Sequence, residues 1–303
     1  MNPLDLITNP LGQFLNFIYN TLAFHSYGLA IIIFTLVIKI VLLPLSIKQY
    51  RSMARMQEVQ PQIQEIQKRY KNDKEKLNQE LMRVYQENKV NPAGGCAPLL
   101  IQMPILISLY WVISSPLQYM LKLPKNIIYG NLENGKVVSN GLVQLFNITG
   151  KSNVEITVIN SFKSDVASKL LDAGTISKIQ DIGRGLVSLK FGSFPGFNLG
   201  IIPTWHLDTL LSNPQYLALI IIPILAAVTT YISIKFSAAQ TSQNADNPMQ
   251  GGMTFAMPLV TTFFTFSVPA GLGLYWIISN LVQIFQQMYM NKYIIKKKEV
   301  VIK

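Results

Sequence analysis

Long apolar stretches separated by short polar segments dominate the pattern along this chain. Uncharged windows long enough to cross a membrane run over residues 97–119 and 216–234, and a third, 29–47, is interrupted only by Lys39. Such windows of about 20 apolar residues are typical of transmembrane helices. The pattern therefore predicts a mostly helical protein. Alternation of apolar and polar residues, which is typical of strands, does not dominate it.

A further stretch, Asn247 to Asn291, contains no charged side chain at all. As one helix it would be about 67 Å long, more than twice the thickness of a bilayer core of about 30 Å. It is therefore predicted to cross twice, with a turn at Ser267–Gly271, where Pro and Gly interrupt the helical pattern. The first of these two crossings, Met253 to Phe266, is expected to span only about 21 Å. Such a short span thins the bilayer locally.

Composition supports this interpretation. Half of the 303 residues are hydrophobic and only 14% are charged, whereas a soluble domain has about a quarter charged residues. The formal net charge of +11 would by itself allow binding to nucleic acid. The single cysteine, Cys96, excludes an intramolecular disulfide.

The positions of the basic residues predict the orientation. Residues 1–28 contain no Lys or Arg, whereas 48–92 contain ten and the segment after Met290 contains five. Because basic residues concentrate on the cytoplasmic side, the N-terminus is expected outside, and 48–92 and the C-terminus in the cytoplasm. Residues 121–212 must then lie outside, which their length permits, since long loops translocate largely regardless of charge.

The expected fold is an all-α polytopic membrane protein with five transmembrane helices, a cytoplasmic helical hairpin and a small mixed extracytoplasmic insertion. The segments, in chain order, are an interfacial N-terminal helix (1–28), transmembrane helix 1 (29–47), the hairpin (48–92), transmembrane helix 2 (97–119), the outer insertion (121–212), transmembrane helix 3 (216–234), a cytoplasmic loop (235–252), transmembrane helices 4 (253–267) and 5 (271–290), and a basic tail (291–303).

The hairpin is expected from apolar residues that recur every three or four positions on otherwise charged helices. One such stripe runs from Met53 and Met56 to Tyr70, and the other from Leu77 to Tyr85. The stripes are interpreted as the seam between two antiparallel helices. Met53 and Met56 could instead contact a client protein, because methionine adapts to varied surfaces.

Two parts of the outer segments also carry local signals. Residues 3–24 have apolar positions at helical spacing and few charges, which suits a helix at the membrane interface, although an ordinary N-terminal tail fits as well. In the insertion, Val154 to Phe162 alternates like a strand, and Asp165 to Gly174 resembles a short helix ended by glycine.

Lys39 is the most unusual residue of the predicted membrane segments. A lysine at mid-membrane costs roughly 2.5–3.5 kcal/mol on insertion scales, so such residues usually face a bundle interior or a water-filled cavity. No Asp or Glu lies in any of the five windows to pair with it. Reaching the headgroups would require about 12 Å, and a neutral Lys39 is a further alternative. A hydrated cavity that holds an unpaired cation is the preferred interpretation.

Other polar residues of the windows are candidates to line the same cavity. Thr35 lies one helical turn before Lys39 on the same face. Each of the others could equally be a polar contact between helices. These candidates are Gln102, Thr229, Thr230, Trp276, Asn280 and Gln283.

Three long motifs give the chain a family resemblance. Residues 43–70, LPLSIKQYRSMARMQEVQPQIQEIQKRY, lead from the first helix into the hairpin. Residues 89–111, KVNPAGGCAPLLIQMPILISLYW, begin the second helix, and residues 269–287, PAGLGLYWIISNLVQIFQQ, form the last. In sequence and spacing these motifs resemble the YidC family of membrane protein insertases, over about 190 residues of the chain.

The resemblance implies five core helices around a hydrophilic groove that opens to the cytoplasm and the lipid, in a bacterial plasma membrane. In the family the groove typically carries an arginine, a threonine one turn before it and an aromatic residue on the last helix. By position these are Lys39, Thr35 and Trp276. Lysine at this position departs from the family pattern. Arginine stays charged and presents a planar fork of donors, whereas lysine is a point charge that can lose its proton when it is desolvated. Most of the outer insertion, about residues 125–200, is a second departure.

The expected function is insertion and assisted folding of nascent membrane proteins without nucleotide hydrolysis, metal or other cofactor, and no enzyme activity is expected. The basic tail, with Lys292, Lys296, Lys297 and Lys298, is expected to contact ribosomal RNA or anionic lipid headgroups. The resemblance also implies the signal recognition particle system and the Sec translocon as partners. An anion-selective channel or transporter that uses Lys39 is the alternative, and an intramembrane Ser–Lys enzyme is a weaker one.

Overall fold

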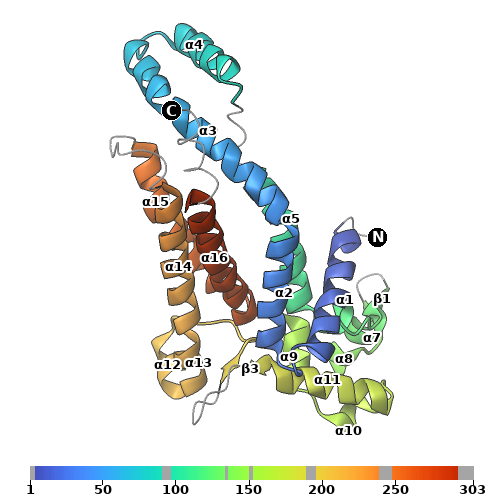
Figure 1. The fold of residues 1–303 in the computed structure, drawn as a ribbon. Coiled ribbons are helices and arrows are strands. Elements are labelled where there is room, and N and C mark those ends of the chain that lie inside the picture. Colours follow the sequence, from blue (N-terminus) through green and yellow to red (C-terminus); the bar gives the residue numbers. More distant parts are fainter. Residues whose placement is uncertain are drawn as a thin grey trace.

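The computed structural model describes residues 4–90, 97–133, 136–149, 153–188, 196–238 and 248–292, and it is mostly helical (Figure 1). Cys96, residues 239–247 and the residues after Lys292 lie outside this part of the chain. The long helices are α1 (Asp5–Thr21), α2 (Tyr27–Val41), α3 (Leu43–Arg69), α4 (Lys74–Glu87), α5 (Ala97–Ser114), α14 (Ile221–Ala238), α15 (Pro248–Thr265) and α16 (Ala270–Met290).

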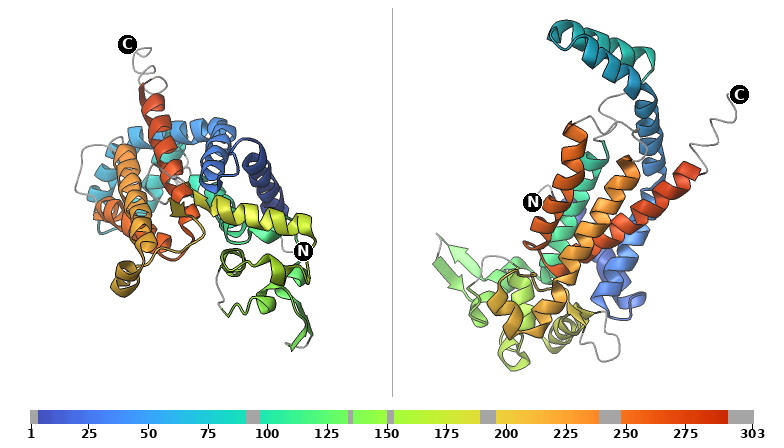
Figure 2. Two further views of the ribbon diagram at one scale, coloured as in Figure 1. Left: turned by 90° about the horizontal axis from the view of Figure 1, so that it is seen from below. Right: turned by 90° about the vertical axis from the view of Figure 1, so that its left-hand side faces the viewer.

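Three layers follow one another along the molecule (Figures 1 and 2). Helices α1, α2, α5, α14, α15 and α16 form the central bundle, in which α16 packs against α2, α5 and α14. The hairpin of α3 and α4 projects from one end, and the segment between α5 and α14 covers the opposite end. The hydrophobic core therefore lies in the bundle, with many side chains of α1, α2, α5 and α16 fully buried.

The hairpin confirms the predicted seam between its helices. Val59 and Ile63 of α3 are buried against Val84 of α4 and Val90 beyond it. Met56, Ile66, Leu81 and Tyr85 pack around this small core. Burial of these side chains is what holds the two otherwise charged helices together.

Helix α2 does not continue straight into the hairpin. It ends at Val41, and Leu43–Met56 of α3 runs at 60° to it. Pro44 lies in the first turn of α3, where its ring has no N–H to donate and would collide with the carbonyl oxygen of Ile40 in a continuous helix. The proline therefore explains why the helix bends at this position.

Length and apolar composition single out one helical segment of the described residues as able to cross a membrane. This segment, Pro214–Phe236, has 23 residues and a mean hydropathy of 2.4. The bent pair Tyr27–Val41 and Leu43–Met56 passes the same test only when taken together. Gln102–Ser114 and Ala256–Thr265 are shorter apolar helices.

Helix α15 begins at Pro248 and ends at Thr265, so its 18 residues extend about 27 Å. Its apolar part, Ala256–Thr265, is one of the shorter apolar helices. The local thinning of the bilayer at this place stays a prediction. The following turn contains Pro269, and α16 begins directly after it at Ala270.

The segment between α5 and α14 folds into short elements. In chain order these are α6 (Pro116–Tyr119), α7 (Lys125–Tyr129), β1 (Asn131–Glu133), β2 (Lys136–Ser139), α8 (Leu142–Leu145), α9 (Val154–Asn160), α10 (Ser164–Ala167), α11 (Ala173–Leu186), β3 (Val187–Ser188), β4 (Phe197–Asn198), α12 (Leu207–Ser212) and α13 (Pro214–Leu219). Strands β1 and β2 form one antiparallel pair, and β3 and β4 form another.

Two local predictions for this segment are wrong. Residues 154–160, which alternate like a strand, form helix α9. This helix buries Ile156, Val158 and Ile159 together in the hydrophobic core. The helix expected from Asp165 to Gly174 ends at Ala167, and Gly174 instead lies in the first turn of α11. Asp172 caps that turn by accepting a hydrogen bond from the Thr175 amide at 2.9 Å, so a new helix starts where the old one was expected to end.

The N-terminal segment forms a helix, α1, which packs along α2 and α5, while its expected place at the membrane interface stays a prediction. Gly12 lets it approach closely, since a Cβ atom there would lie 2.6 Å from the carbonyl oxygen of Tyr119. The Gln13 amide donates to the same carbonyl oxygen at 2.6 Å, and the Tyr119 hydroxyl donates to Asp5 at 3.1 Å. The N-terminal helix is therefore held to the bundle by specific hydrogen bonds.

Glu155 joins the outer segment to the end of the α5 region. Its side chain is fully buried, and its carboxylate oxygens accept hydrogen bonds from the backbone N–H of Gln118 and the Tyr129 hydroxyl, both at 3.0 Å. Burial raises the pKa of Glu155 to about 7, although the two hydrogen bonds favour the charged form.

This raised pKa predicts a specific pH dependence of stability. Between the ordinary pKa near 4.5 and the folded pKa of about 7, the folded protein binds more protons than the unfolded one. The free energy of unfolding should therefore fall by on the order of 3 kcal/mol as pH rises through this window and level off above it. Chemical denaturation in detergent at several pH values measures this change in the free energy of unfolding. Glu155→Gln should remove this slope, and an unchanged slope in that variant would contradict the assignment.

Candidate functional site

Helix α16 carries polar side chains that reach three neighbouring helices. It packs against α2, α14 and α5, and hydrogen bonds link it to each of them. In an apolar bundle such groups are costly unless they find partners. The contacts of α16 therefore define the candidate site.

The first group lies between α16 and α14. The Asn280 amide donates to the hydroxyl oxygens of Thr230 at 2.8 Å and Thr229 at 3.3 Å. Both threonines are nearly buried, and Thr229 in turn donates to the carbonyl oxygen of Leu225 at 2.7 Å. The structure thus brings together three of the residues selected from the sequence.

The second group lies between α16 and α5. The Gln102 amide donates to the Tyr275 hydroxyl at 2.5 Å, and the Tyr275 ring is buried. Gln102 was a sequence candidate, whereas Tyr275 was missed because a tyrosine next to Trp276 resembles an ordinary core aromatic. Its signal was the phenol, which needs a partner when buried.

Lys39 lies on α2, towards the end that leads into the hairpin, and its side chain is partly buried. Among the described residues its ammonium forms neither an ion pair nor a hydrogen bond. The Gln286 amide of α16 reaches the Lys39 backbone carbonyl oxygen at 3.5 Å. The two helices therefore meet at this position, and Gln286 is a further residue that sequence reasoning missed.

The remaining sequence candidates are less closely connected. Thr35 is fully buried, and its hydroxyl donates to the Ile31 carbonyl oxygen of its own helix at 2.6 Å, so it does not present a free donor to Lys39. Trp276 is partly buried against the hydrophobic core. Gln283 is partly exposed on α16.

The hairpin and tail candidates lie at the opposite end from the outer segment. Met56 packs against the small core of the hairpin, while Met53 is partly exposed one turn closer to the bundle. Lys292 is the last described residue, directly after α16. Lys296, Lys297 and Lys298 lie outside the described residues.

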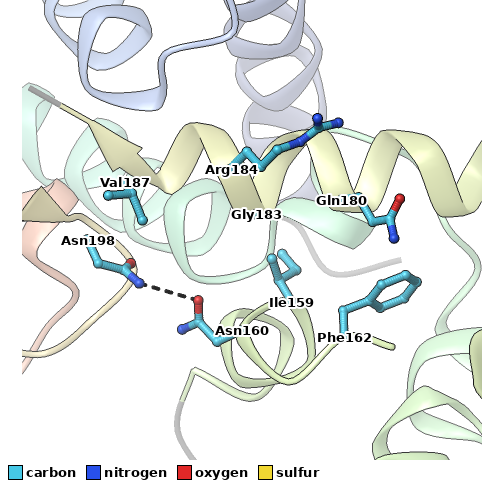
Figure 3. Close-up of a pocket in the computed structure, with 8 residues that line it drawn as sticks. All are labelled: Ile159, Asn160, Phe162, Gln180, Gly183, Arg184, Val187 and Asn198. Atoms are coloured by element: carbon cyan, nitrogen blue, oxygen red, sulfur yellow. Dashed lines mark hydrogen bonds between the residues drawn. The ribbon is translucent and has the colours of Figure 1, made fainter. Parts of the chain in front are cut away.

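A separate cavity of about 730 Å³ lies in the outer segment, between α9 and α11 (Figure 3). The Asn198 amide donates to Asn160 at 3.4 Å across one end of it, and the Gln180 and Phe162 side chains lie at the other end. The Arg184 guanidinium extends away from these side chains. No sequence pattern indicated this cavity, because its residues come from four separate elements.

The described residues contain no group of three or more His, Cys, Asp or Glu side chains close enough to hold an ion. Among them, His25 Nδ1 lies 2.7 Å from an Asp181 carboxylate oxygen, and this contact joins the α1–α2 corner to α11. It therefore links the bundle to the outer segment.

A mostly helical chain, with one described segment long and apolar enough to cross a membrane, fits an α-helical membrane protein. The family model described as 60Kd inner membrane protein matches residues 17–298. The chain belongs to this family.

Several similar proteins carry the name membrane protein insertase YidC. The chain is 31% identical to the protein of Haemophilus influenzae, 30% to that of Rickettsia felis and 29% to that of Geobacter metallireducens. Each alignment covers 95–96% of this chain. The chain spans only 37–39% of the length of these three relatives.

The contact between Gln102 and Tyr275 predicts a measurable loss of stability. Tyr275→Phe removes the hydroxyl that accepts from the Gln102 amide, which should lower the free energy of unfolding by about 1–3 kcal/mol. Denaturation of the purified protein in detergent measures it. Tyr27→Phe is the matched control, because the Tyr27 hydroxyl is buried without a hydrogen-bond partner among the described residues. Equal losses in both variants would show that the Gln102 contact contributes nothing.

Proposed function

We propose that this chain is a membrane protein insertase and chaperone, which inserts nascent membrane proteins into the plasma membrane and helps them fold. Membership in the 60Kd inner membrane protein family and the names of its relatives support this proposal. The mechanism requires no nucleotide hydrolysis, because the favourable transfer of an apolar client segment from water to lipid supplies the free energy.

The proposal includes five membrane crossings, formed by α2, α5, α14, α15 and α16. The ten basic residues of 48–92 and the absence of any from 1–28 support an outer N-terminus and a cytoplasmic hairpin and C-terminus. In this orientation the segment between α5 and α14 lies outside. The arrangement of hairpin and outer segment at opposite ends of the bundle agrees with it (Figure 1).

One observation carries the proposed mechanism: the Lys39 ammonium has no described partner, although its helix packs against polar α16. A cation in such surroundings requires water, a lipid headgroup or a passing anion. We assign Lys39 and the polar residues Gln102, Thr229, Thr230, Trp276, Asn280 and Gln283 to a hydrophilic groove, with Thr35 supporting α2 behind them. The groove is open to the cytoplasm and the lipid.

In this groove Lys39 attracts the short, often acidic, outer tail of a client. Two opposite charges 4 Å apart attract by about 4 kcal/mol at an effective dielectric constant of about 20, before desolvation is subtracted. This attraction offsets part of the cost of moving a polar tail through the membrane. The apolar segment of the client meanwhile slides along the lipid-facing surfaces of α2 and α14.

The hairpin and the basic tail are the proposed cytoplasmic contacts. Met53, partly exposed near the base of the hairpin, is available to a client, and Met56 is shared with the hairpin core. Lys292 begins a basic tail with Lys296, Lys297 and Lys298, which suits ribosomal RNA or anionic headgroups. The signal recognition particle system and the Sec translocon complete the proposed set of partners.

The charge of Lys39 predicts the result of a complementation assay. In cells depleted of their own insertase, Lys39→Arg should restore growth, whereas Lys39→Glu should reduce client insertion at least tenfold, because it repels an acidic tail. Lys178→Glu makes the same charge change on the exposed face of α11 and is the control. Full rescue by Lys39→Glu would remove the charge from the mechanism, and anion conductance of reconstituted vesicles would favour a channel.

Crosslinking locates the path of the client. A photoreactive side chain at Gln102 or Trp276 should crosslink to a ribosome-stalled membrane protein, because both positions are partly accessible and lie on the two helices that flank the groove. Leu259 on α15 is 71% exposed and serves as the lipid-facing control. Stronger crosslinks from Leu259 than from the two groove positions would place the client outside the groove.

A further inference from the structure

A second cluster of positive charge lies at the base of the hairpin, apart from the proposed groove. Lys48, Arg51 and Arg55 lie on one face of α3, and Lys89 follows the end of α4. Together with Ser52 and Val90 they line a cavity of about 270 Å³. Four cations, one hydroxyl and one buried aliphatic side chain thus face the same small space.

These four cations lack acidic partners of the kind that Arg69 and Arg83 have farther out on the hairpin. Farther out, Arg69 pairs with Glu65 at 2.8 Å, and Arg83 pairs with Glu80 at 3.2 Å and Glu87 at 3.3 Å. None of the cavity's cations forms an ion pair with a described residue, and the chain contains no Asp or Glu from residue 6 to residue 57. Their mutual repulsion favours the binding of an anion.

The chemistry of the lining points to a phosphate group. Arginine presents a planar fork of donors that matches phosphate oxygens, and lysine adds a mobile point charge. The Ser52 hydroxyl can donate a further hydrogen bond. A carboxylate would leave several of these donors unused, whereas a phosphodiester has enough oxygens for them.

The bend between α2 and α3 places the cavity at the membrane surface. At 60° to α2, the first part of α3 climbs along the membrane normal by only about 0.75 Å per residue instead of about 1.5 Å. Lys48, Arg51 and Arg55 therefore stay within about 10 Å of the end of α2, close to the headgroup layer, which is about 5–7 Å thick. This placement rests on the proposed function, in which α2 crosses the membrane.

We infer that this cavity binds the phosphate of an anionic phospholipid from the cytoplasmic leaflet and so anchors the base of the hairpin. The small volume suits one headgroup, and Val90 provides an apolar surface beside the charges. An RNA backbone carries the same phosphate chemistry but would have to enter the headgroup layer to reach these residues. A bound lipid there holds α3 at its angle to α2.

The test is native mass spectrometry of the full chain, purified in detergent and titrated with phosphatidylglycerol. Arg51→Gln with Arg55→Gln should weaken binding of the first lipid roughly twenty-five-fold, since each basic residue near the surface contributes about fivefold. Lys68→Gln with Lys71→Gln removes the same charge from the hairpin tip and should leave the affinity unchanged. Equal weakening by the two pairs would overturn the site.

Binding of other ligands distinguishes an anionic lipid from other sources of the phosphate group. Phosphatidylcholine should bind at least tenfold more weakly than phosphatidylglycerol, and inorganic phosphate should not displace the lipid at millimolar concentration. Equal binding of the two lipids, or displacement by phosphate, would overturn the assignment to an anionic lipid. Loss of ribosome co-sedimentation together with unchanged phosphatidylglycerol binding in the Arg51/Arg55 variant would favour RNA and also overturn it.

A second variant tests the same cavity in case the Arg51/Arg55 variant does not fold. Lys48→Gln with Lys89→Asn removes two other charges of the cavity, and asparagine tolerates the positive φ of 51° at residue 89. It should weaken lipid binding to a similar extent, and unchanged binding would contradict the inference. These measurements use no client protein. A negative result for lipid binding therefore does not affect the insertion assay of the Lys39 variants. A negative result of that assay likewise does not affect the interpretation of the lipid measurements.

Discussion

Polar groups inside an apolar helical bundle must find partners, and this requirement governs the arrangement around α16. Asn280 reaches the hydroxyls of α14, Tyr275 receives the Gln102 amide of α5, and Gln286 reaches the backbone of α2. In such surroundings an unpaired donor costs more than the net gain of an ordinary hydrogen bond. These contacts therefore specify which helices pack together, since apolar packing alone is not directional.

Lys39 is a charged exception to this rule, as the Tyr27 hydroxyl is an uncharged one, and the charge suggests a functional interpretation. Its helix contacts α16 through a backbone oxygen, while the ammonium has no described partner. A charge without a partner must be hydrated or must meet a transient one. The same logic applies to the four cations at the hairpin base. Positive charge without a described acidic partner thus underlies both proposed sites, the one for an acidic client tail and the one for a lipid phosphate.

The hairpin and the outer segment together show why only part of the fold could be predicted from the sequence. The amphipathic stripes of the hairpin were read correctly, because each helix buries one stripe and leaves the other faces in water. In the outer segment, α9 is short and buried on several sides, so its apolar residues carry no clear period. Tertiary packing then overrides local propensity, and an alternating stretch becomes a helix.

The sequence by itself determined the helical class, the hairpin seam and most of the polar residues of the candidate site, because periodicity and the rarity of polar groups in apolar windows are local properties. Only the tertiary structure decided which of these residues meet. It joined Asn280 to Thr229 and Thr230 and turned Thr35 towards its own helix. It also gathered Lys89 with cations some forty residues earlier in the chain. Such pairings depend on helix rotation and on the bend at Pro44, which no local pattern encodes.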